Sequence, residues 1–454
     1  MTKDMTAGSP ARLILKFTIP LIFGNLFQQF YSMVDTIIVG RYLGKEALAG
    51  VGSTGSINYM IIGFCIGTCA GFAIPVAQRF GARHFDDLRR FVGNILWLAA
   101  VFSVILALLT VLLCRPILSA MNTPADIYEY AYWYIVIIFA GIPATVFYNI
   151  LASLLRALGD SRTPVIFLVL ASIINIVLDF VLVLGTPMGV AGAALATVAS
   201  QLVSGAACFV FIAKRFDILH ITKDDMRPRP PYMAELCGMG IPMGLQCSIT
   251  AIGGILLQSS VNGLGSLSVA SVAAANKLSA FFTCAFDAMG VSMSTYTGQN
   301  VGARRFDRIP PGLRAGMAIG SVYSIGAFLI LFFFGKVLVT MFIDGSETAI
   351  IESAFQFLMA NSAFYIPLAA VNIYRLLIQG MGYSKIAMFA GVCEMVARSF
   401  AGLVLVPVFG YTAACFANPL AWVMADVFLI PLYIHLLRKT KRQEELEPRT
   451  RTEA

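Results

Sequence analysis

Charged residues are scarce in this chain: Asp, Glu, Lys and Arg together make up 12% of its 454 residues. Soluble domains carry about twice that share, because their surfaces must interact with water. Hydrophobic residues make up 58%, and the mean hydropathy is +0.81. The scarcity of charge therefore excludes an ordinary soluble enzyme and predicts a chain that lies mostly within a lipid bilayer.

Histidine and cysteine offer little chemistry. The three histidines, His84, His220 and His435, lie in or beside basic segments, so no histidine-based metal site is expected. The nine cysteines lie mostly inside apolar runs. Cys65 and Cys69 are one helical turn apart and would be able to share a metal ion, but we favour small packing residues in a hydrophobic interior.

Long apolar runs fill most of the chain. A helix that crosses a bilayer needs about 20 residues, and the expected spans are residues 13–39, 53–77, 92–113, 128–152, 164–184, 190–213, 234–257, 271–297, 313–334, 351–377, 385–406 and 412–437. The strands of a membrane barrel are shorter and alternate in polarity. The predicted fold is therefore an all-α polytopic membrane protein with twelve transmembrane helices.

The basic residues indicate an orientation. If the N-terminus is cytoplasmic, 25 of the 32 lysines and arginines fall in cytoplasmic segments. The positive-inside rule then places both termini in the cytoplasm. The net charge of +8 reflects this bias, so we expect contact with anionic lipid and no binding of nucleic acid.

The two halves of the chain repeat each other. Residues 78–86 match residues 299–307 at an offset of 221, and shared glycines and prolines follow in the same order. Each half has six spans, an even number, so both enter the membrane in the same direction and form a parallel repeat with a cavity between the lobes. The predicted parts are an N-lobe (1–213), a cytoplasmic linker (214–233), a C-lobe (234–438) and a basic, polar cytoplasmic tail (439–454).

Three spans of the N-lobe carry polar stripes at helical spacing. They are Asn25, Gln28, Ser32 and Asp35; Ser172, Asn175 and Asp179; and Thr197, Gln201 and Ser204. At 1.5 Å per residue, Asp35, Asp179 and Thr197 lie within roughly 10 Å of one level near the outer surface. Such oxygens can hold a shared proton or a dehydrated Na⁺. The alternative is polar contact between helices, which two acids without a basic partner serve poorly.

The C-lobe has different ionisable residues. Glu394 and Arg398 are one helical turn apart, which suits an ion pair or a gate. The partner of Arg375 stays open among Asp287, Glu394 and Asp426. The acidic site is not duplicated, because the positions 221 residues after Asp35 and Asp179 are Leu256 and Phe400.

Four prolines lie inside spans at equivalent places in the two halves: Pro20, Pro143, Pro242 and Pro367. Proline removes a helix hydrogen bond and kinks the helix. Pro20 precedes Asp35 on the same predicted helix. Bending at Pro20 would reshape the cavity when Asp35 changes protonation, and a static bend is the alternative.

These features together resemble the multidrug and toxic compound extrusion (MATE) family, and the DinF-like prokaryotic branch in particular. The resemblance rests on the two like halves, the first helix with Pro20 and Asp35, the Gly-Ala-Arg segments, and Asn175, Asp179 and Thr197. It implies that Asp35, Asn175, Asp179 and Thr197 bind the coupling cation and that Pro20 is the bending point. Spans seven and ten lack a deeply embedded acid, so a second cation site of the NorM-like type is not expected.

The predicted function is secondary active efflux: an organic, often cationic, compound leaves the cell as H⁺ or Na⁺ enters. The substrate would contact Asn25, Gln28, Ser32, Gln201, Asp287, Glu394 and Arg398 in the cavity between the lobes. We expect a monomer in a prokaryotic inner membrane, with no cofactor besides the coupling ion.

The sequence disfavours two other functions. A flippase or exporter of lipid-linked saccharides would favour fourteen spans or a cationic cavity, whereas intramembrane acids outnumber arginines here. A membrane enzyme would need a second Asp-rich motif or a His-Glu-x-x-His zinc site, neither of which is in the sequence.

Overall fold

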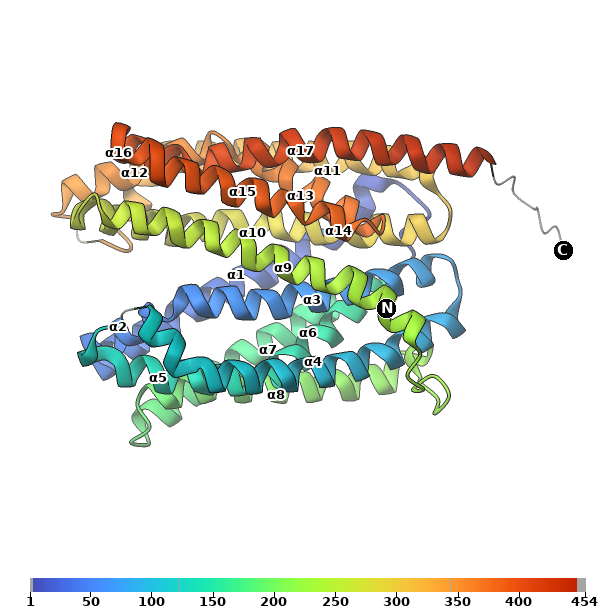
Figure 1. Ribbon diagram of the computed structural model, residues 1–454, viewed down its shortest axis with the longest axis horizontal. Coiled ribbons are helices and arrows are strands. Elements are labelled where there is room, and N and C mark those ends of the chain that lie inside the picture. The colour runs from blue at the N-terminus through green and yellow to red at the C-terminus, as the bar shows by residue number, and fades with distance from the viewer. Residues whose placement is uncertain (1–2, 122, 344, 447–454) are drawn as a thin grey trace.

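The computed structural model describes residues 3–121, 123–343 and 345–446, and these are helices joined by short loops (Figure 1). The first half consists of α1 (Pro10–Ile38), η1 (Val39–Leu43), α2 (Lys45–Ser53), α3 (Gly55–Gly81), α4 (Phe85–Ala120), α5 (Ala125–Ala140), α6 (Ile142–Ala157), α7 (Arg162–Asp179), η2 (Phe180–Leu184) and α8 (Val190–Arg215). The short η3 (Asp217–Leu219) follows.

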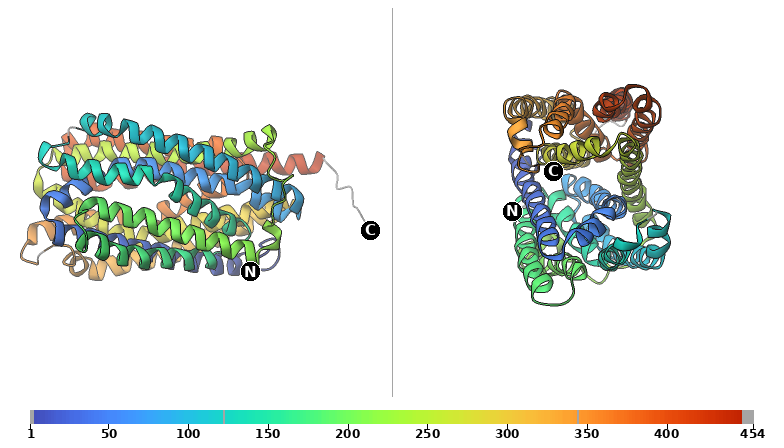
Figure 2. Two further views of the ribbon diagram at one scale, coloured as in Figure 1. Left: turned by 90° about the horizontal axis from the view of Figure 1, so that it is seen from below. Right: turned by 90° about the vertical axis from the view of Figure 1, so that its left-hand side faces the viewer.

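The second half has the same plan. It consists of α9 (Pro230–Asn262), α10 (Ser266–Gly302), η4 (Phe306–Arg308), α11 (Ile309–Val339), α12 (Thr348–Ser362), α13 (Tyr365–Gly380), α14 (Ser384–Ala387), α15 (Phe389–Phe400), η5 (Ala401–Leu405), α16 (Val406–Phe409) and α17 (Tyr411–Leu446). We call α1 to α8 the N-lobe and α9 to α17 the C-lobe. Seen from one end, their helices form two groups (Figure 2).

The predicted spans correspond to the observed helices. Ten helical segments of the described chain are long and apolar enough to cross a bilayer, and the bent pairs α5–α6 and α12–α13 complete twelve when each pair is one span. The bends are 48° and 49°. Pro143 and Pro367 lie in the first turn of α6 and α13, where a missing amide hydrogen costs nothing, so kinks near these two prolines are confirmed. α1 and α9 continue through Pro20 and Pro242.

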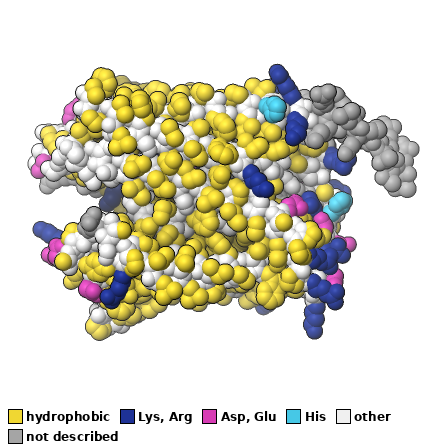
Figure 3. Space-filling model, viewed as in Figure 1, with side chains coloured by type: hydrophobic (Ala, Val, Ile, Leu, Met, Phe, Trp, Pro, Cys, Tyr) yellow, Lys and Arg dark blue, Asp and Glu magenta, His cyan; other side chains and the backbone are white. Residues whose placement is uncertain are grey.

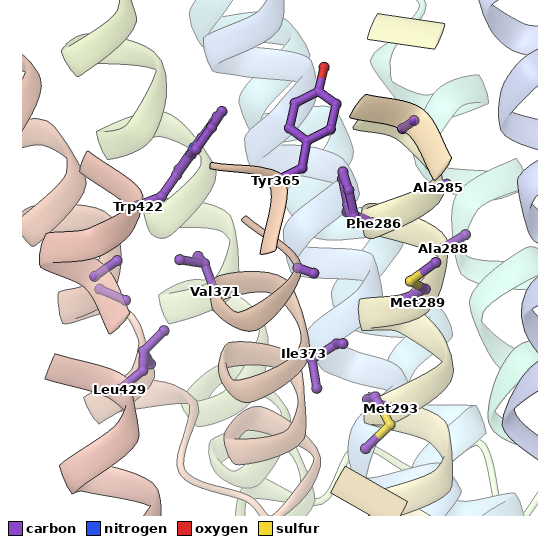
Figure 4. Close-up of a cluster of buried hydrophobic side chains, with 14 of the residues drawn as sticks. Ala285, Phe286, Ala288, Met289, Met293, Tyr365, Val371, Ile373, Trp422 and Leu429 are labelled. Carbon is purple, nitrogen blue, oxygen red and sulfur yellow. The ribbon is translucent and has the colours of Figure 1, made fainter. Parts of the chain in front are cut away.

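Each lobe has its own hydrophobic core. In the C-lobe, Phe286 of α10, Tyr365 of α13 and Trp422 of α17 lie in one cluster (Figure 4), with ring centroids 5.4 Å apart for Phe286 and Tyr365 and 6.4 Å for Tyr365 and Trp422. Such edge-on aromatic contacts add packing energy between helices that are surrounded by lipid.

Helix α1 belongs to both lobes. Its first half is buried in the C-lobe core through Leu13, Ile14, Phe17 and Leu21. Its second half, as far as Asp35, lines a cavity of the N-lobe. Pro20 lies where the two halves of α1 meet. The boundary predicted for the N-lobe, 1–213, therefore includes half a helix that packs on the other lobe.

The linker between the lobes is shorter than predicted. We expected it over 214–233, but α8 runs to Arg215 and α9 begins at Pro230. Pro230 and Pro231 occupy the first positions of α9, where proline is favourable rather than disruptive. The predicted tail, 439–454, begins inside α17, and residues 447–454 lie outside the described residues.

The outer surface is suited to lipid. Hydrophobic side chains cover the middle of the face in Figure 3, and basic side chains gather at the end that carries the C-terminus. We call this the terminal end, because the N-terminus and the interlobe linker also lie toward it (Figures 1 and 2). At the opposite end the two lobes are separated by a notch (Figure 3), and we call this the cleft end.

The lobes meet at the terminal end in a reciprocal contact between α3 and α10. Gly81 lies against Gln299 and Gly302 against Gln78, so closely that a Cβ on either glycine would overlap the facing carbonyl oxygen. Gln78 Nε2 donates to the Gly380 carbonyl at 3.1 Å, and Gln299 Nε2 donates to the Ala157 carbonyl at 2.9 Å. The residues of one contact are the repeat equivalents of the residues in the other, so the two lobes are joined symmetrically. We call these four residues of α3 and α10 (Gln78, Gly81, Gln299 and Gly302) the terminal seal.

Candidate functional site

A cavity of about 550 Å³ lies in the N-lobe and is lined by α1, α3, α5, α6, α7 and α8, with α10 of the C-lobe on one side. Cavities of this size hold drug-sized molecules. The lining of α1 extends from Leu21 to Asp35, about 20 Å at 1.5 Å per residue. Asp35 therefore marks the end of the cavity toward the cleft, and Leu21 its end toward the terminal seal.

Three of the four predicted coupling residues line this cavity: Asp35, Asn175 and Thr197. The Asn175 Nδ2 donates a hydrogen bond to Thr197 Oγ1 at 3.3 Å. Asp179 lies one turn beyond Asn175 on α7, is fully buried, and is close enough to Asp35 for the two charges to interact. The structure thus brings together residues from three helices that the sequence places far apart.

Several side-chain oxygens of this cluster have no hydrogen-bond partner among the described residues. Asp35 Oδ1, Asn175 Oδ1 and both carboxylate oxygens of Asp179 are buried without a hydrogen-bond donor from any described residue. Buried unpaired carboxylate oxygens are unfavourable unless a proton or a cation neutralises them. No group of three His, Cys, Asp or Glu side chains comes together in the described chain as a multivalent metal site would require. The cluster suits a proton or one small hard cation bound by oxygen.

Wide helical turns lie beside both acids. The π-helical η2 begins directly after Asp179, and η1 begins four residues after Asp35. Such turns often lie at functional sites. However, η5 of the C-lobe begins 221 residues after η2 and follows the apolar Phe400. The turn after α7 therefore belongs to the repeated fold, and only the acid is particular to the N-lobe.

The other predicted cavity residues divide between two cavities. Asn25, Gln28, Ser32, Gln201 and Asp287 line the N-lobe cavity, whereas Glu394 and Arg398 line a C-lobe cavity of about 330 Å³. Asp287 of α10 lines both cavities. The single interlobe cavity that we expected is thus divided. The N-lobe and C-lobe cavities meet at Asp287, and a further cavity of about 620 Å³, lined mainly by α3 and α9, adjoins the C-lobe cavity at Arg398.

The C-lobe acid Glu394 is neutralised, unlike the N-lobe acids. Arg375 Nη1 lies 3.0 Å from Glu394 Oε1, and Arg398 Nη2 lies 3.1 Å from Glu394 Oε2. Arg398 Nε also donates to Asn418 Oδ1 at 3.0 Å. The expected Glu394–Arg398 pair is confirmed, and the partner of Arg375 is Glu394. Glu394 therefore has two cationic partners, whereas both oxygens of Asp179 have no partner among the described residues.

Sequence reasoning missed several residues of the N-lobe cavity, among them Tyr31, Tyr134, Tyr148, Asn149 and Arg156. Arg156 lies beyond the predicted span 128–152, yet it is part of α6 and lines the cavity. The spacing of seven residues between Asn149 and Arg156 places both on one helix face, and this signal would have revealed them.

The chain contains the MatE family pattern twice, over residues 20–181 and 242–404. It belongs to the MatE family. The two matches cover corresponding parts of the N-lobe and the C-lobe, as expected for a chain built from two copies of one six-helix unit. The MATE resemblance noted from the sequence is therefore confirmed, and this MatE protein is a multi-pass membrane transporter.

Its relatives include transporters. The chain is 29% identical over 357 residues to "Probable multidrug resistance protein YoeA" of Bacillus subtilis, with 77% of each chain covered. It is 23% identical to "FAD transporter" of Shewanella oneidensis, with 85% of each covered. Among solved structures, an outward-facing multidrug resistance MATE family transporter of the MOP superfamily matches with a TM-score of 0.90 at 21% identity, over 97% of this chain and 100% of that one.

Proposed function

We propose that this MatE protein is an antiporter that moves organic, often cationic, compounds out of the cell as H⁺ or Na⁺ moves in. The observation that carries the proposal is the pair of acids Asp35 and Asp179. Asp35 Oδ1 and both carboxylate oxygens of Asp179 are buried without a partner among the described residues. One proton or one Na⁺, with Asn175 and Thr197 as added oxygen ligands, would complete the cluster. In the C-lobe, Glu394 is paired with two arginines, so we assign the coupling to the N-lobe acids.

Coupling follows from the place of α1 in both lobes. Binding of a cation removes negative charge beside the outer half of α1, whereas the inner half stays packed in the C-lobe core. Pro20 lies at the junction and lacks the hydrogen bond that would stiffen it. A bend there would narrow the N-lobe cavity and expel the substrate toward the cleft end.

Efflux from proteoliposomes tests this function. Purified protein is reconstituted with rhodamine 123, a cationic dye, and a pH gradient or a Na⁺ gradient is imposed separately. FAD is included as a second substrate, because one relative is an FAD transporter. Dye movement that follows one imposed gradient supports antiport and identifies the ion. Dye movement that ignores both gradients contradicts it.

The proposed topology places the terminal end in the cytoplasm. A single cysteine replacing Asp224, in the interlobe linker, should resist a membrane-impermeant maleimide in intact cells and react in inside-out vesicles. A cysteine replacing Asn262, the last residue of α9 at the cleft end, should behave in the opposite way. Both are made on a cysteine-free background, and labelling of the Asp224 position in intact cells would reverse the orientation.

The C-lobe acids should affect the substrate rather than the ion. Asp287→Asn removes a charge that faces both cavities, so we expect the KM for a cationic dye to rise by about tenfold. Glu394→Gln breaks the bridge between two arginines and should alter selectivity. Dye efflux by both variants should still follow the imposed ion gradient, and a loss of that dependence would assign coupling to the C-lobe.

A further inference from the structure

Arg156 lies on α6 at the end of the N-lobe cavity toward the terminal seal. It lines the main cavity and also a small adjoining cavity of about 60 Å³ that it shares with Ala77, Met243 and Thr295. These neighbours come from both lobes. The guanidinium therefore lies at the junction of the lobes rather than in the solvent beyond the terminal end.

Arg156 has no charged partner in the part of the chain that the structure describes. Arg156 Nη2 donates a hydrogen bond to Ser153 Oγ at 2.7 Å. The titratable side chains that act on it are Tyr148, Cys69 and Cys208, and within residues 3–121, 123–343 and 345–446 no carboxylate forms an ion pair with it. A guanidinium has five N–H donors, so most of its donors are open to the cavity.

The nearest acid along the chain is already occupied. Asp160 Oδ1 accepts hydrogen bonds from the backbone amides of Arg162 and Thr163, each at 3.0 Å, and its Oδ2 accepts from Thr163 Oγ1 at 2.6 Å. Asp160 thus serves to start α7. The equivalent of Arg156 in the C-lobe, 223 residues later, is the neutral Gln379, so the fold unit itself does not require an arginine here.

Arginine is the side chain best suited to bind a planar or tetrahedral oxyanion, because its donors form a rigid fork. We propose that Arg156 is an oxyanion subsite, which binds the carboxylate or phosphate of a bipolar organic substrate. Asp287 supplies the complementary end. Asp287 lies one turn of α10, about 6 Å, from Val291. Val291, like Arg156, lines both the main cavity and the small adjoining cavity. The substrate class is a compact molecule that has an acid at one end and a cation at the other.

The test uses a matched pair of dyes. It rests on the proposed function in one respect only, which is that the N-lobe cavity binds the substrate. Rhodamine 110 carries a free carboxylate, and rhodamine 123 is its methyl ester with the same cationic ring system. Equilibrium binding to the purified full chain in detergent needs no ion gradient, so it can succeed even if antiport fails. Wild-type protein should bind rhodamine 110 more tightly than the ester, and inorganic phosphate should compete with rhodamine 110 alone.

Arg156→Gln, which copies the C-lobe residue, should weaken binding of rhodamine 110 by about tenfold or more and leave the ester unchanged. Arg156→Lys should keep part of the preference, and it serves if the glutamine variant does not fold. Arg162→Gln, an exposed arginine outside the cavity, should change neither affinity. Equal affinity of the wild type for both dyes, or equal weakening of both by Arg156→Gln, overturns the proposal. Loss of the preference when phosphatidylglycerol is added would assign the site to a lipid phosphate instead.

Discussion

Asp35→Asn and Asp179→Asn should each reduce gradient-driven efflux to the level of vesicles without protein, while the variants stay folded in the membrane. Asparagine has nearly the shape of aspartate but cannot gain or lose the proton and binds a cation poorly. The structure also predicts the sign of the effect on stability. Removing a buried charge without a partner should leave the thermal unfolding temperature unchanged or raise it, because the folded state no longer holds a desolvated carboxylate.

The control for this pair is Asp126→Asn. Asp126 is an exposed acid at the start of α5, at the cleft end, and should transport as the wild type does. Efflux and unfolding temperature are measured on the same preparations. Normal efflux by either Asp35→Asn or Asp179→Asn, at matched protein levels, would remove that residue from the coupling site.

Gly302→Ala and Gly81→Ala should both open the terminal seal. The added Cβ would overlap the carbonyl oxygen of Gln78 or Gln299, and neither backbone has room to move without separating α3 from α10. Overpacking of this kind costs about 1–3 kcal/mol, enough to shift a conformational equilibrium by roughly five- to 150-fold. We expect equal effects from the two variants. Gly81 faces Gln299 and Gly302 faces Gln78, and these two glutamines are equivalent in the repeat.

Opening of the terminal seal is measured as the access of a labelling reagent from the terminal end. A single cysteine replacing Thr295, which is buried beside the seal, should react with an impermeant maleimide in inside-out vesicles much faster when Gly302 or Gly81 is alanine. Gly326→Ala in α11 is the matched control, since nothing lies within 4 Å of the Cβ it would add. Unchanged labelling in both seal variants would show that α3 and α10 do not close this end.

Hydropathy and periodicity predicted the number of spans and the polar faces of α1, α7 and α8. These features depend on local sequence alone, because a stripe at helical spacing stays a stripe wherever the helix packs. The acid cluster was predictable for the same reason: Asp35, Asp179 and Thr197 lie at one depth in any bundle that places their helices side by side.

What the sequence could not predict depends on how the helices are rotated and shared between lobes. Nothing in residues 10–38 shows that the first half of α1 packs in the C-lobe, because an apolar helix face does not identify the helices that it will contact. Arg156 follows an apolar run and precedes a loop, so its charge alone suggested the cytoplasmic surface. Glu394 could be identified as the partner of Arg375 only once the distance between α13 and α15 was known. No pattern within either helix contains that distance.

Binding of the coupling ion in the N-lobe is tested most directly by measuring the movement of the ion itself. Proteoliposomes that contain a pH-sensitive or Na⁺-sensitive dye record the ion that accompanies efflux of rhodamine 123, with wild type, Asp35→Asn and Asp287→Asn compared under one gradient. Wild type and Asp287→Asn should move the ion with the substrate, whereas Asp35→Asn should move neither. Ion movement that persists in Asp35→Asn and disappears in Asp287→Asn would contradict it.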